Sequence, residues 1–160
     1  MSTLKVNVLQ DTSGNNLDRV GQIVTASTSS AVSTSAGSLV DSGLTANITP
    51  QFTSSKILIL IDSPYHGIRS SGSTSTFNIR VLRDSTSVFA GGASESDYQC
   101  GIGGSISSNR MCGMISKMIV DSPSSTSQLT YKLQVQSGYN LTLNMQDNTT
   151  AHIALMEILQ

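Results

Sequence analysis

Few side chains in this sequence are of the types that carry acid–base or metal chemistry, so their spacing is the first question. Glu95 and Asp97 are two residues apart, which puts both carboxylates on one side of an extended chain, where they could bind a divalent cation through oxygen. Two carboxylates alone supply too few ligands, and a solvated loop is the favoured interpretation. His66, within Ser63–Gly67, is expected to be a surface imidazole in a turn. His152 lies either at a subunit axis or simply at the start of the final strand.

Nucleophilic and phosphate-binding motifs are missing from the sequence as well. Cys100 and Cys112 have no paired His or Cys at zinc-ligand spacing, and we expect reduced, half-buried thiols rather than a disulfide. Serine is abundant, but no G-x-S-x-G segment marks a nucleophile. The glycine-rich segments AGGAS and CGIGGS lack the lysine and the following helix of a phosphate-binding loop. The sequence therefore predicts no enzyme activity, no metal and no cofactor.

The composition limits the partners that the chain can bind. Only 12% of the 160 residues are charged, against about a quarter in typical globular proteins, whereas 29 Ser and 16 Thr predict a hydroxyl-rich surface. With 9 Lys and Arg residues and a net charge of -1, we expect neither nucleic-acid nor membrane binding. No apolar run reaches the ~18 residues that span a bilayer, and the start lacks the layout of a signal peptide. We therefore expect synthesis in a cytoplasm.

Alternation with a period of two residues dominates the chain and indicates strands with one buried and one wet face. On both sides of Ser137–Gly138 the alternation predicts two strands paired across a tight turn. Their inward positions are Leu129, Tyr131, Leu133 and Val135 before the turn and Tyr139, Leu141, Leu143 and Met145 after it. Strand-like segments recur at 4–9, 21–27, 44–49, 56–62, 77–83, 87–91, 111–120, 129–135, 139–145 and 151–159. Many short strands between turn-forming clusters predict an all-β fold, an antiparallel β-sandwich of the jelly-roll type.

Two of these segments, 56–62 and 151–159, are apolar on both faces. A sandwich covers only one face of each sheet, so the second face is expected to be covered by another subunit. The expected subunit interface on the final strand is Ile153, Leu155, Met156 and Ile158. By contrast, Met111, Met114 and Met118 are expected to fill gaps in the core.

Five segments, taken in order, carry a resemblance to a known family. They are STLKVNVLQDTSGNN, LVDSGLTANITPQFTSSKILILID, FNIRVLRDSTSVFAGG, SPSSTSQLTYKLQVQ and AHIALMEI, and they cover nearly the whole chain. In this order they resemble small virion structural proteins and fibre-tip domains of tailed bacteriophages, especially marine and cyanobacterial ones. The resemblance implies a homotrimeric jelly roll similar to tumour-necrosis-factor-like domains, on the exterior of a virion and made in the cytoplasm of a bacterial host.

Residues 1–20 are expected to form an N-terminal arm that precedes a jelly-roll domain at 21–160. Leu4, Val6 and Val8 alternate with Lys5 and Asn7, which predicts a short strand. A terminal strand can add to a sheet of another protein through its backbone. We therefore expect the arm to dock on the virion or on a neighbouring protomer. The alternative is that it completes the protein's own sheet.

The resemblance leaves two functions open. A fibre-tip domain follows a long shaft, whereas only about twenty residues precede the strands here. The favoured expectation is therefore a capsid decoration or cement protein that binds the major capsid protein or another virion protein. The alternative is a tail-fibre tip or adhesin that binds a host cell-surface saccharide, with Tyr65 and Tyr98 in loops as stacking residues. An aromatic content of 4% without Trp argues against this alternative.

Overall fold

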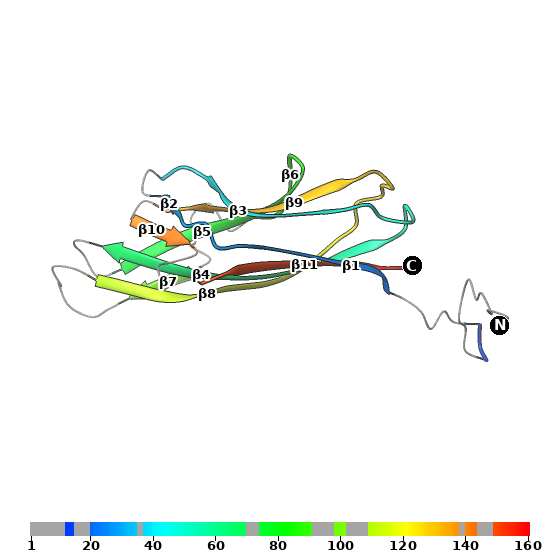
Figure 1. Cartoon of the computed structure of the whole chain (residues 1–160), viewed down its shortest axis with the longest axis horizontal. Coiled ribbons are helices and arrows are strands. Elements are labelled where there is room, and N and C mark those ends of the chain that lie inside the picture. The colour runs from blue at the N-terminus through cyan, green and yellow to red at the C-terminus, as the bar shows by residue number, and fades with distance from the viewer. Residues whose placement is uncertain are drawn as a thin grey trace.

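The computed structural model describes residues 12–14, 20–34, 37–69, 74–90, 98–101, 109–137, 140–143 and 149–160. The regular elements in these ranges are all β-strands, and they form two antiparallel sheets packed face to face as a sandwich (Figure 1). The predicted fold class is therefore confirmed.

Sheet I contains β1 (Val20–Thr28), β2 (Val32–Thr34), β4 (Lys56–Arg69), β8 (Asn109–Asp121), β10 (Asn140–Leu143) and β11 (Ala151–Ile158). Sheet II contains β3 (Val40–Ile48), β5 (Thr74–Arg83), β6 (Thr86–Ala90), β7 (Tyr98–Gly101) and β9 (Leu129–Gln136). The long strand β4 lies at the centre of sheet I, with β8 on one side and with β11 and β10 end to end on the other.

The strand pairing is nested, which is the topology of a jelly roll. β1 pairs with β11 and β4 with β8 in sheet I, while β3 pairs with β9 and β5 with β6 and β7 in sheet II. In the order β1/β11, β3/β9, β4/β8 and β5/β6–β7, each pair is enclosed by the previous pair along the chain and lies in the opposite sheet. A long hairpin that is rolled into two layers gives this order, so the sequence prediction of a jelly roll is confirmed.

The inward positions of the alternating segments fill the space between the sheets. Along β9 the pattern is strict, because Leu129, Tyr131, Leu133 and Val135 are buried while the residues between them are not. β4 contributes Ile57, Ile59 and Ile61, and β11 contributes Ile153 and Leu155. Each such aliphatic side chain contributes about 1.5–3 kcal/mol when fully buried.

Two local predictions are wrong. Ser63–Gly67 is not a turn but part of β4, and His66 is buried rather than on the surface. Pro64 is tolerated in the strand because β11 pairs with β4 only as far as Asp62 and β10 starts to pair at Tyr65. Pro64 therefore falls in the gap between β11 and β10 and has no partner on that side of β4, while on the other side it pairs with Met114 of β8.

The predicted hairpin across Ser137–Gly138 is also wrong. β9 lies in sheet II between β3 and β5, whereas β10 lies in sheet I and pairs with β2 and β4. The chain crosses from one layer to the other at this point. Local alternation locates both strands but does not identify their partners, since pairing depends on residues far away in the sequence.

A buried carboxylate closes one end of the sandwich. Glu157 of β11 is fully buried, and its two carboxylate oxygens accept hydrogen bonds from the backbone N–H of Gln51 (2.6 Å) and from Nε2 of Gln22 (2.8 Å). Gln22 Nε2 also donates to the carbonyl oxygen of Thr49 (2.7 Å). A Cβ on Gly21 would lie 2.9 Å from Glu157 Oε2, so a larger residue there would have to displace the carboxylate. These contacts tie the loop after β3 to β1 and β11.

A second carboxylate on the same rung joins the two sheets. Glu157 pairs with Ile57, and Ile57 pairs with Asp121 of β8. Asp121 Oδ2 accepts hydrogen bonds from Arg83 Nη1 (2.6 Å) and from the hydroxyl of Tyr131 (2.7 Å), both on sheet II. Burial, together with Asp121, raises the pKa of Tyr131, so the phenol stays a neutral donor. Three of the few charged side chains, Glu157, Asp121 and Arg83, thus hold one end of the sandwich together.

We expect the Glu157 cluster to make stability fall in acid. Burial works to raise the pKa of Glu157, but the hydrogen bonds from Gln22 and Gln51 outweigh it and hold the pKa below its ordinary value. A lowered folded-state pKa gives stability that is present above the unfolded pKa of about 4.3 and is lost as the pH falls through the folded value. The melting temperature should therefore drop between about pH 5 and pH 3.

Glu157→Gln should lose about 1–3 kcal/mol at pH 7, because a donor replaces an acceptor beside Gln22, and its melting temperature should depend less on pH. Asp41→Asn is the control, because the pKa of the exposed Asp41 is lowered as well, mainly by the hydrogen bond from Lys132. This variant should keep most of the acid dependence. If the unfolding free energies of the parent and of Glu157→Gln differed by the same amount at pH 7 and at pH 3, this would contradict the assignment of the acid dependence to Glu157.

Candidate functional site

The outer face of sheet I is apolar where β1, β11, β4 and β8 lie side by side. One rung carries Ile23, Met156, Leu58 and Val120, and the next carries Thr25, Ala154, Leu60 and Met118. Of these side chains, Met118 is 73% exposed, Ile23 58% and Val120 57%. We call the six large ones, Ile23, Leu58, Leu60, Met118, Val120 and Met156, the outer apolar face. Adjacent exposed side chains of this kind on a soluble protein mark an interaction surface.

The outer face of sheet II has the opposite character. Its exposed or half-buried positions on β3 and β9 are polar: Asp41, Thr45, Asn47, Thr130, Lys132, Gln134 and Gln136. Asp41 accepts hydrogen bonds from Lys132 Nζ (2.8 Å) and Gln134 Nε2 (2.5 Å). The two sides of the sandwich therefore differ, with one suited to water and one suited to a partner.

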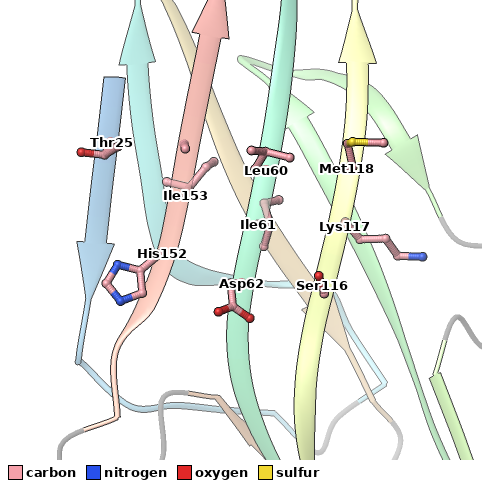
Figure 2. Close-up of a pocket in the computed structure, with 10 residues that line it drawn as sticks. Thr25, Leu60, Ile61, Asp62, Ser116, Lys117, Met118, His152 and Ile153 are labelled. Atoms are coloured by element: carbon pink, nitrogen blue, oxygen red, sulfur yellow. The ribbon is translucent and has the colours of Figure 1, made fainter. Parts of the chain in front are cut away.

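A hollow of about 470 Å³ lies on the outer face of sheet I, between the apolar rungs and a polar rung. The polar rung consists of Ser27, His152, Asp62 and Ser116, in register on four neighbouring strands. Figure 2 shows His152 and Asp62 side by side at one end of the hollow and Leu60 and Met118 at the other. Because the small Ala154 lies between larger neighbours, it leaves the space that forms the hollow.

The structure separates the four residues assigned to a subunit interface. Ile153 and Leu155 are 1% and 0% exposed and lie in the core of the chain itself, so assigning them to an external interface is wrong. Met156 and Ile158 are half-buried on the outer face, and their assignment stays a prediction. Because a strand alternates its faces, consecutive apolar residues are shared between two different surfaces.

For two of the three methionines of β8, the prediction of a core position is wrong. Met118 and Met114, which is 49% exposed, lie outside the core, although the sequence predicts that they fill it. In Met111–Val120 the inward positions are Ile115, buried, and Ile119, half-buried against the core. The alternation of this segment could have predicted this. Met114, Met118 and Val120 are at even positions and Ile115 is at an odd one, so they point to the opposite face of the sheet.

The saccharide-contact candidates lie in strands rather than in loops. Tyr65 is in β4, half-buried, with its ring edge-on to Phe77 (centroids 4.7 Å apart, interplanar angle 61°). Tyr98 is in β7. The proposed role of both residues in saccharide contact stays a prediction. A residue that stacks on a sugar needs an exposed ring, whereas the ring of Tyr65 is half-buried and packs on Phe77.

The remaining candidates are placed as follows. Cys112 is a free thiol in β8 and is exposed rather than half-buried. Glu95, Asp97, Leu4, Val6 and Val8 lie outside the described residues. Within the described ranges, no group of three or more His, Cys, Asp or Glu side chains could hold a metal ion. The same ranges contain no helix long and apolar enough to cross a bilayer.

Comparison with known proteins identifies no family. No family model matches the chain, and no curated protein matches it. Among solved structures, a subviral particle of infectious bursal disease virus VP2 aligns with 98% of this chain and 43% of that chain, at 12% identity and a TM-score of 0.47. The Gt strain of the same virus aligns over the same shares at 11% identity and a TM-score of 0.42. The chain thus spans less than half of the length of these proteins.

We expect Gly113 to be required beside Tyr65. A Cβ at Gly113 would lie 2.7 Å from the Tyr65 hydroxyl oxygen, so Gly113→Ala must displace a ring that packs on Phe77. The variant should lose about 1–3 kcal/mol of unfolding free energy in denaturant titrations. Cys112→Ala, at the exposed neighbouring position, should stay within about 0.5 kcal/mol of the parent. In a Tyr65→Leu background, Gly113→Ala should cost clearly less, and an equal cost in both backgrounds would refute the contact.

Proposed function

We propose that this protein is a non-enzymatic structural protein of a bacteriophage virion, a homotrimeric decoration or cement protein on the particle exterior. The observation that carries the proposal is the outer apolar face of sheet I, set against the polar outer face of sheet II. The order of sequence segments resembling tailed-phage virion proteins supports the same conclusion. A protein of this kind works through buried area and not through bond-making chemistry.

The outer apolar face supports self-association on physical grounds. An antiparallel sheet in a sandwich normally turns polar residues outward, but here β11, β4 and β8 turn Met156, Leu58, Leu60, Met118 and Val120 outward. Covering a large apolar side chain completely contributes about 1.5–3 kcal/mol. Several such side chains per interface are needed to offset the roughly 4–15 kcal/mol that association costs. A second copy offers a surface with the same low charge.

The remaining surface supports an exterior position on the particle. Outside the apolar face, the exposed positions of β3 and β9 carry hydroxyl, amide and a few paired charged groups. A surface of this composition stays hydrated without a strong field of one sign. In this proposal the trimer binds the major capsid protein or another virion protein, and the polar side faces the medium.

The oligomeric state tests the proposal directly. Light scattering on the purified chain should give a mass near three times 16.8 kDa. Met118→Asp should reduce this mass to that of one chain, because a charge in the interface would be buried without a partner. Met118 is 73% exposed in the single chain, so the substitution leaves the fold itself intact.

Thr45→Asp is the matched control, since it adds the same charge at an exposed position on the outer face of sheet II. It should leave the mass unchanged. A parent protein that is monomeric at micromolar concentration would refute the trimer. The position of the protein on the particle is a separate test. Images of particles that carry labelled protein should show the label on the head, whereas label at the tail tip would favour a fibre-tip protein.

The hollow beside His152 and Asp62 favours a second candidate, a tail adhesin that binds a host cell-surface saccharide. Hydroxyl, carboxylate and imidazole groups at one end and Leu60 and Met118 at the other suit a sugar ring with one polar edge and one apolar face. Ala154→Phe would fill the hollow. Glycan binding by the parent that Ala154→Phe abolishes without changing the mass would favour the adhesin over the decoration protein.

A further inference from the structure

The outer face of sheet I carries a ridge as well as the hollow. Met114, Met118 and Val120 project from this side of β8, and all three are exposed. Among the described large apolar side chains, Met118 is the most exposed. We call these three residues the β8 ridge. The hollow of about 470 Å³ lies beside the ridge, where Ala154 of β11 leaves room next to Leu60 of β4 (Figure 2).

An interface that covers this face has to fill the hollow. The cores of stable protein interfaces are packed as densely as protein interiors, and the side chains around a void lose their contacts on one side. The hollow has roughly three times the volume of an apolar cavity of about 150 Å³ that holds benzene, so it has room for more than one side chain. The chain's own Met118 does not fill it, because this side chain is 73% exposed. The side chains that fill the hollow must therefore come from a partner.

We propose that the β8 ridge of one copy of this chain inserts into the hollow of the next copy. This inference rests on the proposed self-association and names the side chains that meet in it. Methionine side chains are unbranched and adapt to irregular spaces. The ridge residues are uncharged, so they bring no like charge to His152 and Asp62 at the polar end of the hollow. Every copy supplies one ridge and one hollow, so copies of the chain cover both without a further partner.

The ridge and the hollow lie at different places on the face, so two copies meet through unlike surfaces. Met118 is on β8 and Ala154 is on β11, with β4 between the two strands. Two steps of about 4.8 Å, or roughly 10 Å, therefore separate these strands within one chain. A contact between different surfaces of identical chains is heterologous, and it closes into a ring when the rotation permits. Three copies, each with its ridge in the hollow of the next, form such a ring.

Substitutions that fill the hollow or shorten the ridge test the fit. Ala154→Phe occupies the hollow and should lower the association constant roughly tenfold or more, measured by light scattering over a series of concentrations. Met118→Ala leaves part of the hollow empty and should also weaken association. The double variant should recover part of the loss, because the shortened ridge makes room for the phenylalanine. Thr45→Phe, on the outer face of sheet II, is the matched control and should keep the parent's mass.

Cysteine cross-linking identifies the side chains that meet. In a Cys100→Ser, Cys112→Ser background, Met118→Cys is combined with Ala154→Cys or with Thr25→Cys, which both line the hollow. A disulfide forms only when the two Cβ atoms are about 3.5–4.5 Å apart. Within one chain the strands of each pair are roughly 10 Å or more apart, so every link joins two copies. After mild oxidation, at least one pair should give linked dimers and trimers on a non-reducing gel.

Met118→Cys with Thr45→Cys is the matched control for the links and should stay unlinked. A protein that is trimeric by light scattering but keeps its mass with Ala154→Phe, or gives no link with either pair, overturns the inference and leaves the proposed function standing. Equal linking by Met118→Cys alone also overturns it, because ridge would then meet ridge. Linked species that stop at two chains overturn the ring. A monomeric parent is distinguished by its mass and refutes the proposed function itself.

Discussion

The two-sided nature of a β-strand is the constraint on which the rest of this structure depends. Successive side chains point to opposite faces, and a two-layer sandwich covers only one of them. Ile57, Ile59 and Ile61 of β4 satisfy the inner layer, yet Leu58 and Leu60 between them are apolar as well. The fold buries the first set within one chain, whereas the second set lies on the outer face of sheet I, where Leu60 is 38% exposed.

The nested topology concentrates this second set in one place. Rolling the hairpin sets β11 and β8 on either side of β4, although the two strands are far from β4 and from each other in the chain. The outward residues of three separate segments thereby become neighbours on shared rungs. The same rolling leaves β8 at the margin of sheet I, where its regular edge and its exposed methionines meet.

The polar groups inside the fold hold its segments together through hydrogen bonds. Glu157 and Asp121 lie on the last inward-facing rung of sheet I, and each accepts two hydrogen bonds from other elements of the fold. Since buried carboxylates are costly unless paired, these partners must stay in place for the end of the sandwich to close. The hollow beside His152 and Asp62 differs, because its polar rung opens outward and can meet a ligand or a partner.

Much of the fold follows from the sequence alone. Period-two alternation and turn-forming clusters determine the all-β class and the location of most strands, because each depends on a few adjacent residues. The sequence also determines that 56–62 and 151–159 carry apolar residues on both faces. The tertiary structure alone decides which apolar residue belongs to which surface, as Ile153 and Met118 demonstrate with opposite outcomes. It also decides that 129–136 and 140–143 lie in different sheets, since strand partners are chosen by packing between segments that are distant in the chain.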